Sequence, residues 1–270
     1  MPEDPAAHGQ RAYDVRCDWG PTGGAALVAD LGPDDVAVVV DVLSFTTTLS
    51  IAVARGTRVH PFRWRDERAV SYAAERGAAL AVGRLEARDL ADRPGGPPPS
   101  LSPALLLAAE PLPAIVLPSP NGSTICAALG AGGVPVVGGA LRNASAVAAH
   151  CADRVAGGAR VAVVAAGERW PDGTLRPAVE DLWGAGAVLA ALRRQLPGGE
   201  RTALSPEAEA ALAAYERVAA DLPALLPTVA GGRELDDAGF GADVAAAADR
   251  DAEDVVPVLT GDGFVDAPTA

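Results

Sequence analysis

An aspartate followed by a run of threonines is the first group of residues whose types and spacing could do chemistry. Asp41 comes directly after the apolar residues 36–40, and Thr46, Thr47 and Thr48 follow shortly after it. A carboxylate at this point can hold a hard cation, and free backbone N–H groups at the start of a helix attract anions. The same pattern is typical of an aspartate that caps a helix while threonines pack its first turn. Both interpretations stay open for this segment alone.

A second candidate corner lies in residues 118–124, after another apolar run. Gly122 lets the backbone approach a ligand closely, and Ser123 offers a hydroxyl at a predicted helix start. With Asn121, the segment fits equally well an ordinary Pro/Asn/Gly turn with a serine or threonine cap. Asn143 opens a further predicted helix after the next strand.

Adjacent acids, Glu180 and Asp181, open the long helix predicted at 179–195. Acids in a first helical turn commonly just complement the helix dipole. Small residues one turn later leave space for something to approach, so a metal or water ligand is a competing interpretation. Glu168 and Asp172 lie in the preceding loop and could join these acids.

A further acidic run precedes the predicted closing strand 255–259, and such a run is most often a solvated face. Asp243 is the better site candidate within it, because it stands just after the end of a loop predicted at 231–241.

The elements that must position these residues are strands and helices in alternation. The run 36–40 is continuous and β-branched, which predicts a strand that is covered on both faces in a parallel sheet. Open α/β sheets bind ligands at the carboxyl ends of their strands. We therefore expect the candidate residues to meet at one edge of a sheet. Its other strands are predicted at 13–19 (an edge strand), 58–62, 79–82, 114–117, 134–137 and 160–165.

The remaining segments are predicted to be irregular. Residues 1–11 resemble a disordered leader, which leaves 12–270 as a single domain. Glycines predict turns at 20–24 and 138–139. The Pro/Gly-rich segment 92–100 predicts a long surface loop that covers a site or is a tolerated insertion.

Composition excludes several functions. The formal charge of -13 and pI of about 4.6 argue against a nucleic-acid partner or an anionic membrane surface. All 22 basic residues are arginine, which excludes a P-loop lysine, a Schiff-base lysine and a lysine general base. A small anion can still bind through local donors or a metal. A homo-oligomer is compatible with this composition.

The cysteines and histidines give no catalytic or zinc pattern. The three cysteines are widely spaced, which predicts neither a disulfide framework nor a zinc site, but a reducing, cytoplasmic compartment. No signal-peptide core and no long uncharged apolar span occurs. The absence of a G-x-S-x-G elbow and of G-x-G-x-x-G after a strand argues against a serine hydrolase and a dinucleotide-binding protein.

Five segments taken together resemble the 2-phosphosulfolactate phosphatase family. The likeness runs in order and at compatible spacing from about residue 36 to about residue 264. The segments are DVLSFTTT at 41–48, LSP at 101–103, SPNGST at 119–124, NASAV at 143–147 and VEDLWGAG at 179–186.

The resemblance implies an α/β fold, a three-layer α/β/α arrangement with a mostly parallel central sheet. It also implies Mg²⁺-dependent hydrolysis of 2-phosphosulfolactate to sulfolactate and phosphate, a step toward coenzyme M. The small anionic phosphate ester is then the expected partner. Asp41 is the implied catalytic residue, and Asp41, Glu180 and Asp181 are the implied metal ligands. The implied substrate-binding residues are Thr46, Thr47, Thr48, Asn121, Gly122, Ser123 and Asn143.

Two departures from the family pattern bear on function. Family members typically carry an arginine where this chain has Ser44, and a Gly-Gly-Glu-Arg motif where it has residues 82–85. A guanidinium is the natural fork for a phosphate or sulfonate, which a serine cannot replace. Arg84 or Arg142 are candidates to compensate. The alternatives are a non-catalytic module that binds a small anion, or a phosphatase with a shifted small-ester substrate in which Phe45 fills part of the pocket.

Overall fold

A nine-stranded sheet forms the centre of the computed structural model, which describes residues 5–63, 67–93, 96–196 and 204–268. In their order across the sheet, the strands are β1 (Val15–Trp19), β7 (Val161–Ala165), β2 (Val36–Val40), β6 (Val136–Gly139), β10 (Pro257–Thr260), β11 (Gly263–Asp266), β3 (Arg58–Phe62), β5 (Ala114–Pro118) and β4 (Ala79–Leu80). A separate two-stranded ribbon pairs β8 (Glu168–Arg169) with β9 (Leu175–Arg176).

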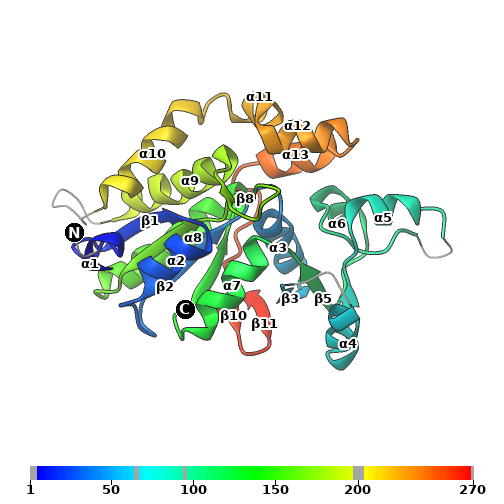
Figure 1. Ribbon diagram of the computed structural model, residues 1–270, viewed down its shortest axis with the longest axis horizontal. Helices are drawn as coiled ribbons and strands as arrows, with labels where there is room; N and C mark the ends of the chain where they lie inside the picture. Colours follow the sequence, from blue (N-terminus) through cyan, green and yellow to red (C-terminus); the bar gives the residue numbers. More distant parts are fainter. Residues whose placement is uncertain (1–4, 64–66, 94–95, 197–203, 269–270) are drawn as a thin grey trace.

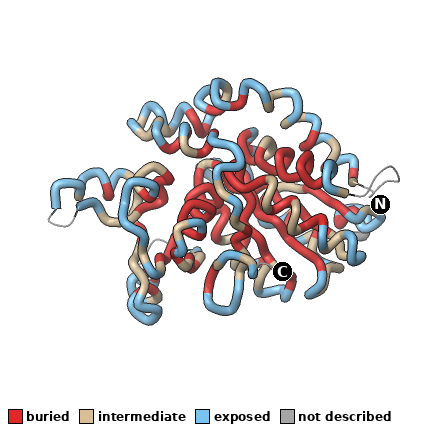
Figure 2. The backbone as a smooth tube through the Cα atoms, turned by 180° about the vertical axis from the view of Figure 1, so that it is seen from behind, coloured by how far each residue is buried: buried red, intermediate tan, exposed pale blue. Residues whose placement is uncertain are grey.

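Strand β2 is buried on both faces, as its unbroken apolar sequence predicts. Val36, Val38 and Val40 pack into one hydrophobic cluster, whereas Ala37 and Val39 pack into the cluster on the opposite face. All five are fully buried. Figure 2 shows buried segments through the middle of the molecule and exposed ones around its outside. Alternate side chains of a strand point to opposite faces, so β2 ties two cores together.

Helices cover both faces of the sheet and give the expected three layers (Figure 1). Helices α8 (Ala144–Ala156), α9 (Val179–Gln195) and α10 (Pro206–Val218) bury their apolar residues in the first cluster. Helices α2 (Gly20–Val28), α3 (Phe45–Ala54) and α7 (Gly122–Ala131) do so in the second. The remaining helices are α1 (Pro5–His8), α4 (Glu67–Glu75), α5 (Arg84–Asp89), α6 (Pro103–Ala108), α11 (Leu222–Leu225), α12 (Ala230–Asp237), α13 (Gly241–Ala248) and the 3₁₀ turns Leu141–Asn143 and Leu226–Thr228.

The sheet consists of two parallel groups joined by an antiparallel hairpin. Strands β1, β7, β2 and β6 are parallel, and so are β3, β5 and β4. The hairpin β10–β11 pairs antiparallel with each group, with Val258 opposite Val137 in β6 and Phe264 opposite Val59 in β3. The predicted single closing strand 255–259 is therefore the first half of an inserted hairpin.

Three predictions of irregular structure are wrong. Each concerns a glycine-containing segment that lies wholly or mostly in a helix or strand. Residues 20–24 form the first turn of α2, residues 138–139 belong to β6, and α12 occupies most of the predicted loop 231–241. A Cβ on Gly138 would collide with Leu49 of α3, and one on Gly232 with the Leu226 carbonyl. Glycine here allows close packing rather than a turn.

The predictions for the edge strand, for residues 1–11 and for the Pro/Gly-rich segment 92–100 have different outcomes. Strand β1 lies at one edge of the sheet as expected. Residues 1–4 of the predicted leader lie outside the described residues, whereas residues 5–8 form α1 and the Gln10 side chain is hydrogen-bonded with the Cys17 backbone. In the Pro/Gly-rich segment, residues 94–95 are likewise outside, and Ser100 bridges to Val82. The division into a leader and a single domain 12–270 stays a prediction.

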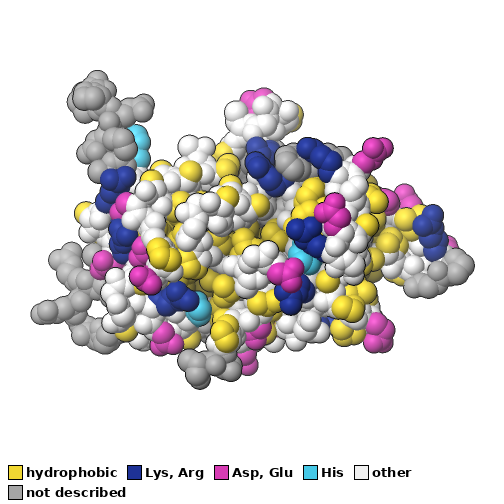
Figure 3. All heavy atoms as spheres, turned by 90° about the horizontal axis from the view of Figure 1, so that it is seen from below, with side chains coloured by type: hydrophobic (Ala, Val, Ile, Leu, Met, Phe, Trp, Pro, Cys, Tyr) yellow, Lys and Arg dark blue, Asp and Glu magenta, His cyan; other side chains and the backbone are white. Residues whose placement is uncertain are grey.

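The distribution of charged side chains on the surface and the hydropathy of the helices can be compared with the composition. On the face drawn in Figure 3, arginine and acidic side chains are interspersed. Within the described residues, no helix is both long and apolar enough to span a membrane.

Candidate active site

Asp41 lies at the carboxyl end of β2 and connects two helix starts. Its Oδ1 accepts a hydrogen bond from the backbone N–H of Phe45 at 3.1 Å, at the start of α3. Its Oδ2 accepts one from the N–H of Gly122 at 2.9 Å, at the start of α7. The side chain therefore caps a helix, as one sequence interpretation holds, and at the same time brings the Asn121–Gly122 corner to the end of β2.

The meeting of these corners does not follow from the strand order alone. Three successive antiparallel pairings separate β6 from β3, so the two parallel groups run in opposite senses along the ladder. The segment after β5 nevertheless reaches the end of β2, because Gly122 bonds to Asp41. A Cβ at position 122 would lie 2.6 Å from both Asp41 Oδ2 and Phe45 Cδ1, so this contact requires glycine.

Asp181 ties a third strand end to the same place. Its Oδ1 accepts from the N–H of Val42 at 2.7 Å, just beyond β2. Its Oδ2 accepts from the N–H of Gly167 at 2.8 Å, just beyond β7. The first turn of α9 thus brings Asp181 and its neighbour Glu180, both buried, to the strand ends.

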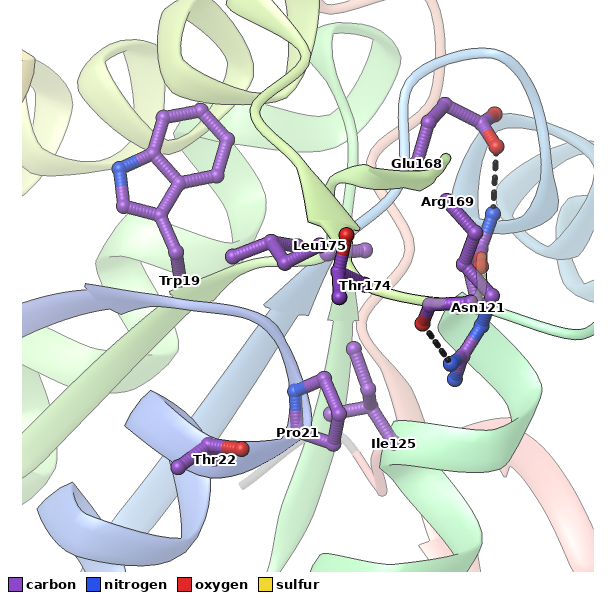
Figure 4. Close-up of a pocket in the computed structure, with 11 residues that line it drawn as sticks. Trp19, Pro21, Thr22, Asn121, Ile125, Glu168, Arg169, Thr174 and Leu175 are labelled. Atoms are coloured by element: carbon purple, nitrogen blue, oxygen red, sulfur yellow. Dashed lines mark hydrogen bonds between the residues drawn. The ribbon is translucent and has the colours of Figure 1, made fainter. Parts of the chain in front are cut away.

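Glu168 completes a cluster of four carboxyl groups, which we call the acid cluster: Asp41, Glu168, Glu180 and Asp181. Its Oε2 accepts a hydrogen bond from Asn121 Nδ2 at 2.8 Å (Figure 4). Asp172, the other loop acid considered from sequence, is exposed and bonds to Thr174 instead. Of the two loop acids, only Glu168 belongs to the site.

Burial and mutual repulsion raise the pKa of every member of the acid cluster. Burial is the largest cause for Asp41, opposed by the Phe45 and Gly122 N–H groups and by the charge of Arg84. Burial, then the charges of Asp41 and Glu180, raise the pKa of Asp181 well above its ordinary range.

The two glutamates follow the same logic. Burial, then the charge of Glu168, raise the pKa of Glu180. Burial, then the charge of Asp41, raise the pKa of Glu168 to about 7. Such a like-charge cluster favours the uptake of a proton or a cation.

The threonine hydroxyls are engaged by the main chain. Thr46 donates to the Asp41 carbonyl at 2.8 Å, Thr47 to the Val42 carbonyl at 2.8 Å, and Thr48 to the Leu101 carbonyl at 3.2 Å. All three side chains are fully buried. Thr46 and Thr47 thus organise the turn from β2 into α3, as the structural alternative for this segment predicts, and Thr48 joins α3 to Leu101.

Ser123 and Asn143 are engaged in the same way. The Ser123 hydroxyl donates to the Ser119 carbonyl at 2.7 Å and also bonds to the Phe62 carbonyl. Asn143 accepts from the Ala140 N–H at 2.8 Å, and its amide donates to two carbonyls at 3.2 Å. Among the predicted substrate-binding residues, Asn121 and Gly122 are the ones whose hydrogen bonds in the described structure go to carboxylate oxygens of the acid cluster, whereas Thr46 bonds to the main chain of Asp41.

The family typically has an arginine where this chain has Ser44. In this structure the side chain of Arg84 reaches Ser44 instead. Its Nη2 donates to the Ser44 hydroxyl, and its Nε donates to Asp243 Oδ2 at 2.7 Å. Asp243 is buried and also accepts from the Ala104 N–H at 3.1 Å. Its role is to hold Arg84 in place.

Arg142, the other candidate to compensate, is held elsewhere. It forms a bidentate pair with Glu253, with N–O distances of 2.6 to 2.9 Å, and donates to the Ala246 carbonyl at 2.6 Å.

The acid cluster suits a hard cation in its chemistry, although its side chains are spread around the site. Among the described residues, no group of three or more His, Cys, Asp or Glu side chains converges as a ready metal site. Mg²⁺ commonly takes only one or two protein carboxylates and completes its shell with water and phosphate oxygens. The carboxyl oxygens and the mutual repulsion of the four acids fit such an ion.

The fold and the site together define an α/β protein with a buried acid cluster where strand ends converge. A family model described as 2-phosphosulpholactate phosphatase matches residues 26–262, and the chain therefore belongs to that family. A search of curated proteins found no match to the chain.

Proposed function

We propose that this protein is a Mg²⁺-dependent phosphoric monoester hydrolase that acts on a small acidic phosphate ester, with 2-phosphosulfolactate as the first candidate. The observation that carries the proposal is the acid cluster at three converging segments of a chain that the family model matches over residues 26–262. The cytoplasmic location and a role in coenzyme M formation remain predictions from the sequence.

The metal is part of the proposal. When bound by carboxylates among Asp41, Glu180 and Asp181, Mg²⁺ would supply positive charge to the phosphate oxygens. Its uptake would also relieve the repulsion that raises the pKa values of these groups.

Asp41 is the proposed group that acts on the attacking water or itself attacks phosphorus. Two backbone N–H groups fix its carboxylate, so its position is determined before substrate binds. In the water-attack form, the water oxygen bonds to phosphorus, its proton passes to Asp41, and the ester P–O bond breaks.

Glu168 is the proposed proton donor to the departing alkoxide oxygen. Its pKa of about 7 keeps a proton available near neutral pH, and Asn121 orients the carboxyl group. The proton balance then closes, since Asp41 gains one proton and Glu168 loses one.

Arg84 is the proposed anion-binding group. Its guanidinium contacts Ser44 and is oriented by the buried Asp243, so a charged fork is present although position 44 itself is a serine. This arrangement supports a phosphate or a second acidic group of the substrate as its ligand.

The alternative is a non-catalytic module for a small anion. Two observations favour it. Main-chain N–H groups bond to both carboxylate oxygens of Asp41 and of Asp181. The threonine hydroxyls donate to main-chain carbonyls, as Thr46 does to Asp41. Calorimetric binding of phosphate without turnover of any ester would support it.

The test is phosphate release from a panel of phosphorylated small acids, including 2-phosphosulfolactate, phospholactate and phosphoglycolate, with Mg²⁺ and then with EDTA. We expect metal-dependent release that Asp41→Asn lowers by about a hundredfold or more. Asp172→Asn is the matched control, because this aspartate is exposed and outside the cluster. Turnover that survives EDTA, or full activity in Asp41→Asn, would contradict the proposal.

A further inference from the structure

Arg176 of the β8–β9 ribbon stands directly opposite Glu168 of the acid cluster. The two residues are paired across this antiparallel ribbon. Side chains of directly opposite residues lie on the same face, with Cβ atoms about 4.5–5.5 Å apart. The positive charge of Arg176 accordingly opposes the rise in pKa of Glu168 and of Glu180. A guanidinium group therefore lies beside the two glutamates of the acid cluster.

The Arg176 side chain is largely buried, yet few of its donors are used. It is 15% exposed, and a guanidinium carries more N–H donors than any other side chain. Within the described part of the chain, its side-chain hydrogen bond runs from Nη2 to Glu234 Oε2 at 3.4 Å. The guanidinium carbon also lies 5.8 Å from the centre of the Trp170 ring, a contact that uses none of these donors. The guanidinium fork is thus held in place and open to a ligand with anionic oxygens.

Glu234 is a weak competitor for this fork. It lies in α12, and its side chain is 67% exposed. An ion pair with one partner in solvent contributes little to stability, because water screens it. An anionic group of a bound substrate can therefore replace Glu234 as the partner of Arg176 with little loss.

Arg84 supplies a second guanidinium, at the Asp41 end of the acid cluster. It contacts Ser44, its side chain is likewise 15% exposed, and its charge opposes the rise in pKa of Asp41. The acid cluster thus has one guanidinium beside Asp41 and another beside Glu168, where Arg176 lies. Two such groups match a ligand with two anionic groups, whereas a neutral phosphate ester would use only one of them.

We propose that Arg176 is a specificity-determining residue that binds the second anionic group of the substrate, a carboxylate or sulfonate, while Arg84 binds the phosphate. This inference rests on the proposed function and deepens it, because it assigns the requirement for an acidic ester to one side chain. No pattern in the sequence singles out Arg176.

The test compares two ligands that differ in one charge. Phosphonoacetate carries a carboxylate where phosphonoacetamide carries a neutral amide of the same shape, and a phosphatase does not hydrolyse their P–C bonds. We would titrate the protein with each ligand, in the presence of Mg²⁺, by calorimetry. Phosphonoacetate is expected to bind about tenfold more tightly, since it adds a charge-assisted hydrogen-bonded pair. Both affinities are measured on the same protein, so their ratio does not depend on how much of the sample is folded.

Variants of the ribbon locate this preference. Arg176→Gln is expected to reduce it to about twofold or less, and Arg176→Lys, which keeps the charge but loses the fork, to about fourfold. Arg169→Gln is the matched control, because Arg169 occupies the adjacent position of the ribbon, on the opposite face. Its guanidinium donates to the Gly173 and Pro120 carbonyls, and this variant should keep the preference of the unmodified protein.

Glu234→Gln separates substrate binding from a structural ion pair. If the substrate replaces Glu234, this variant should keep the full preference for phosphonoacetate or increase it. If Arg176 served only to join the ribbon to α12, Glu234→Gln would resemble Arg176→Gln.

The outcomes separate this inference from the proposed function. Equal affinities in the unmodified protein, no binding of either ligand, or a preference that persists in Arg176→Gln would each overturn the inference. Loss of the preference in Arg169→Gln or in Glu234→Gln would overturn it as well. Phosphate release from phospholactate, with a preference that survives Arg176→Gln, would leave the phosphatase standing and refute the assignment of Arg176. A preference that depends on Arg176 without turnover of any ester would support the assignment and count against catalysis.

Discussion

Among single residues, Glu168 is a partly buried acid of the cluster whose pKa is raised to about 7. Burial raises its pKa first and the charge of Asp41 second, while the Asn121 amide and Arg176 oppose the shift, with a result of about 7. Its sequence signal is slight, because the sequence shows only one acid in a predicted loop after the strand 160–165, whereas the structure places it in β8. Only its contact with Asn121, 47 residues away in the chain, identifies it as part of the site.

Glu168→Gln should change the pH dependence of activity. If Glu168 donates a proton, kcat/KM of the unmodified protein should fall as pH rises through the pKa of Glu168, which bound Mg²⁺ should place below the metal-free value of about 7 because the cation offsets the charge of Asp41. The variant should lose about a hundredfold in kcat and should lack this alkaline limb. The measurement is the pH profile of phosphate release for both proteins. If the activity of the variant falls at alkaline pH as that of the unmodified protein does, a group other than Glu168 causes the fall.

The same shift predicts a pH dependence of stability. The folded pKa of about 7 lies above the ordinary value of 4.5, so the native state holds this proton more tightly than the unfolded chain does. The stabilisation is fully present below the ordinary value and is lost as pH rises through about 7. Urea unfolding should show the unmodified protein losing stability relative to Glu168→Gln over this window; a constant difference would contradict the linkage.

Among the elements, the start of α7 depends on a glycine that allows it to reach Asp41. The N–H of Gly122 bonds to Asp41 Oδ2, and no room exists there for a Cβ. The packing of two helix starts on one carboxylate is therefore what unites the two sequence corners.

Gly122→Ala should damage both stability and activity. Its Cβ would lie 2.6 Å from Asp41 Oδ2 and from Phe45 Cδ1, so one of them must move. We expect a loss of about 1–3 kcal/mol in the free energy of unfolding and at least about a tenfold loss of kcat/KM. Gly261→Ala is the control, because a Cβ at that position would meet no atom within 4 Å and the change should be neutral within about 0.5 kcal/mol. Equal behaviour of the two variants would refute the argument.

In the molecule as a whole, the β10–β11 hairpin joins the two parallel groups of strands. Phe264 of β11 is fully buried and packs edge-on against Phe45, with ring centroids 6.5 Å apart. Phe45 begins α3 beside Asp41, so the last strand of the chain supports the helix on which the site is built.

Phe264→Ala should destabilise the protein by about 3–5 kcal/mol, as expected for a buried ring replaced by a cavity. Denaturant unfolding measures this, with Val70→Ala as the control because Val70 is 59% exposed. Phe264→Leu should cost less than the alanine variant. A near-neutral Phe264→Ala would mean that the hairpin is not a structural link.

The sequence alone determined the elements that depend on local pattern. The unbroken apolar run 36–40 predicted a strand buried on both faces, and the residues around Asp41, Asn121 and Glu180 predicted helix starts nearby, which the structure has at Phe45, Gly122 and Val179. These succeed because strand burial and helix starts follow from residues close together in the chain.

Tertiary structure alone decided which of these residues face one another. The inserted hairpin, the Arg84 contact with Ser44 and the close packing at Gly138 and Gly122 depend on partners far apart in the sequence, which local patterns do not encode. The same holds for the hydroxyl of Thr48, whose acceptor is the Leu101 carbonyl. A side chain's charge and role depend on the buried groups around it, and only the folded chain brings those groups together.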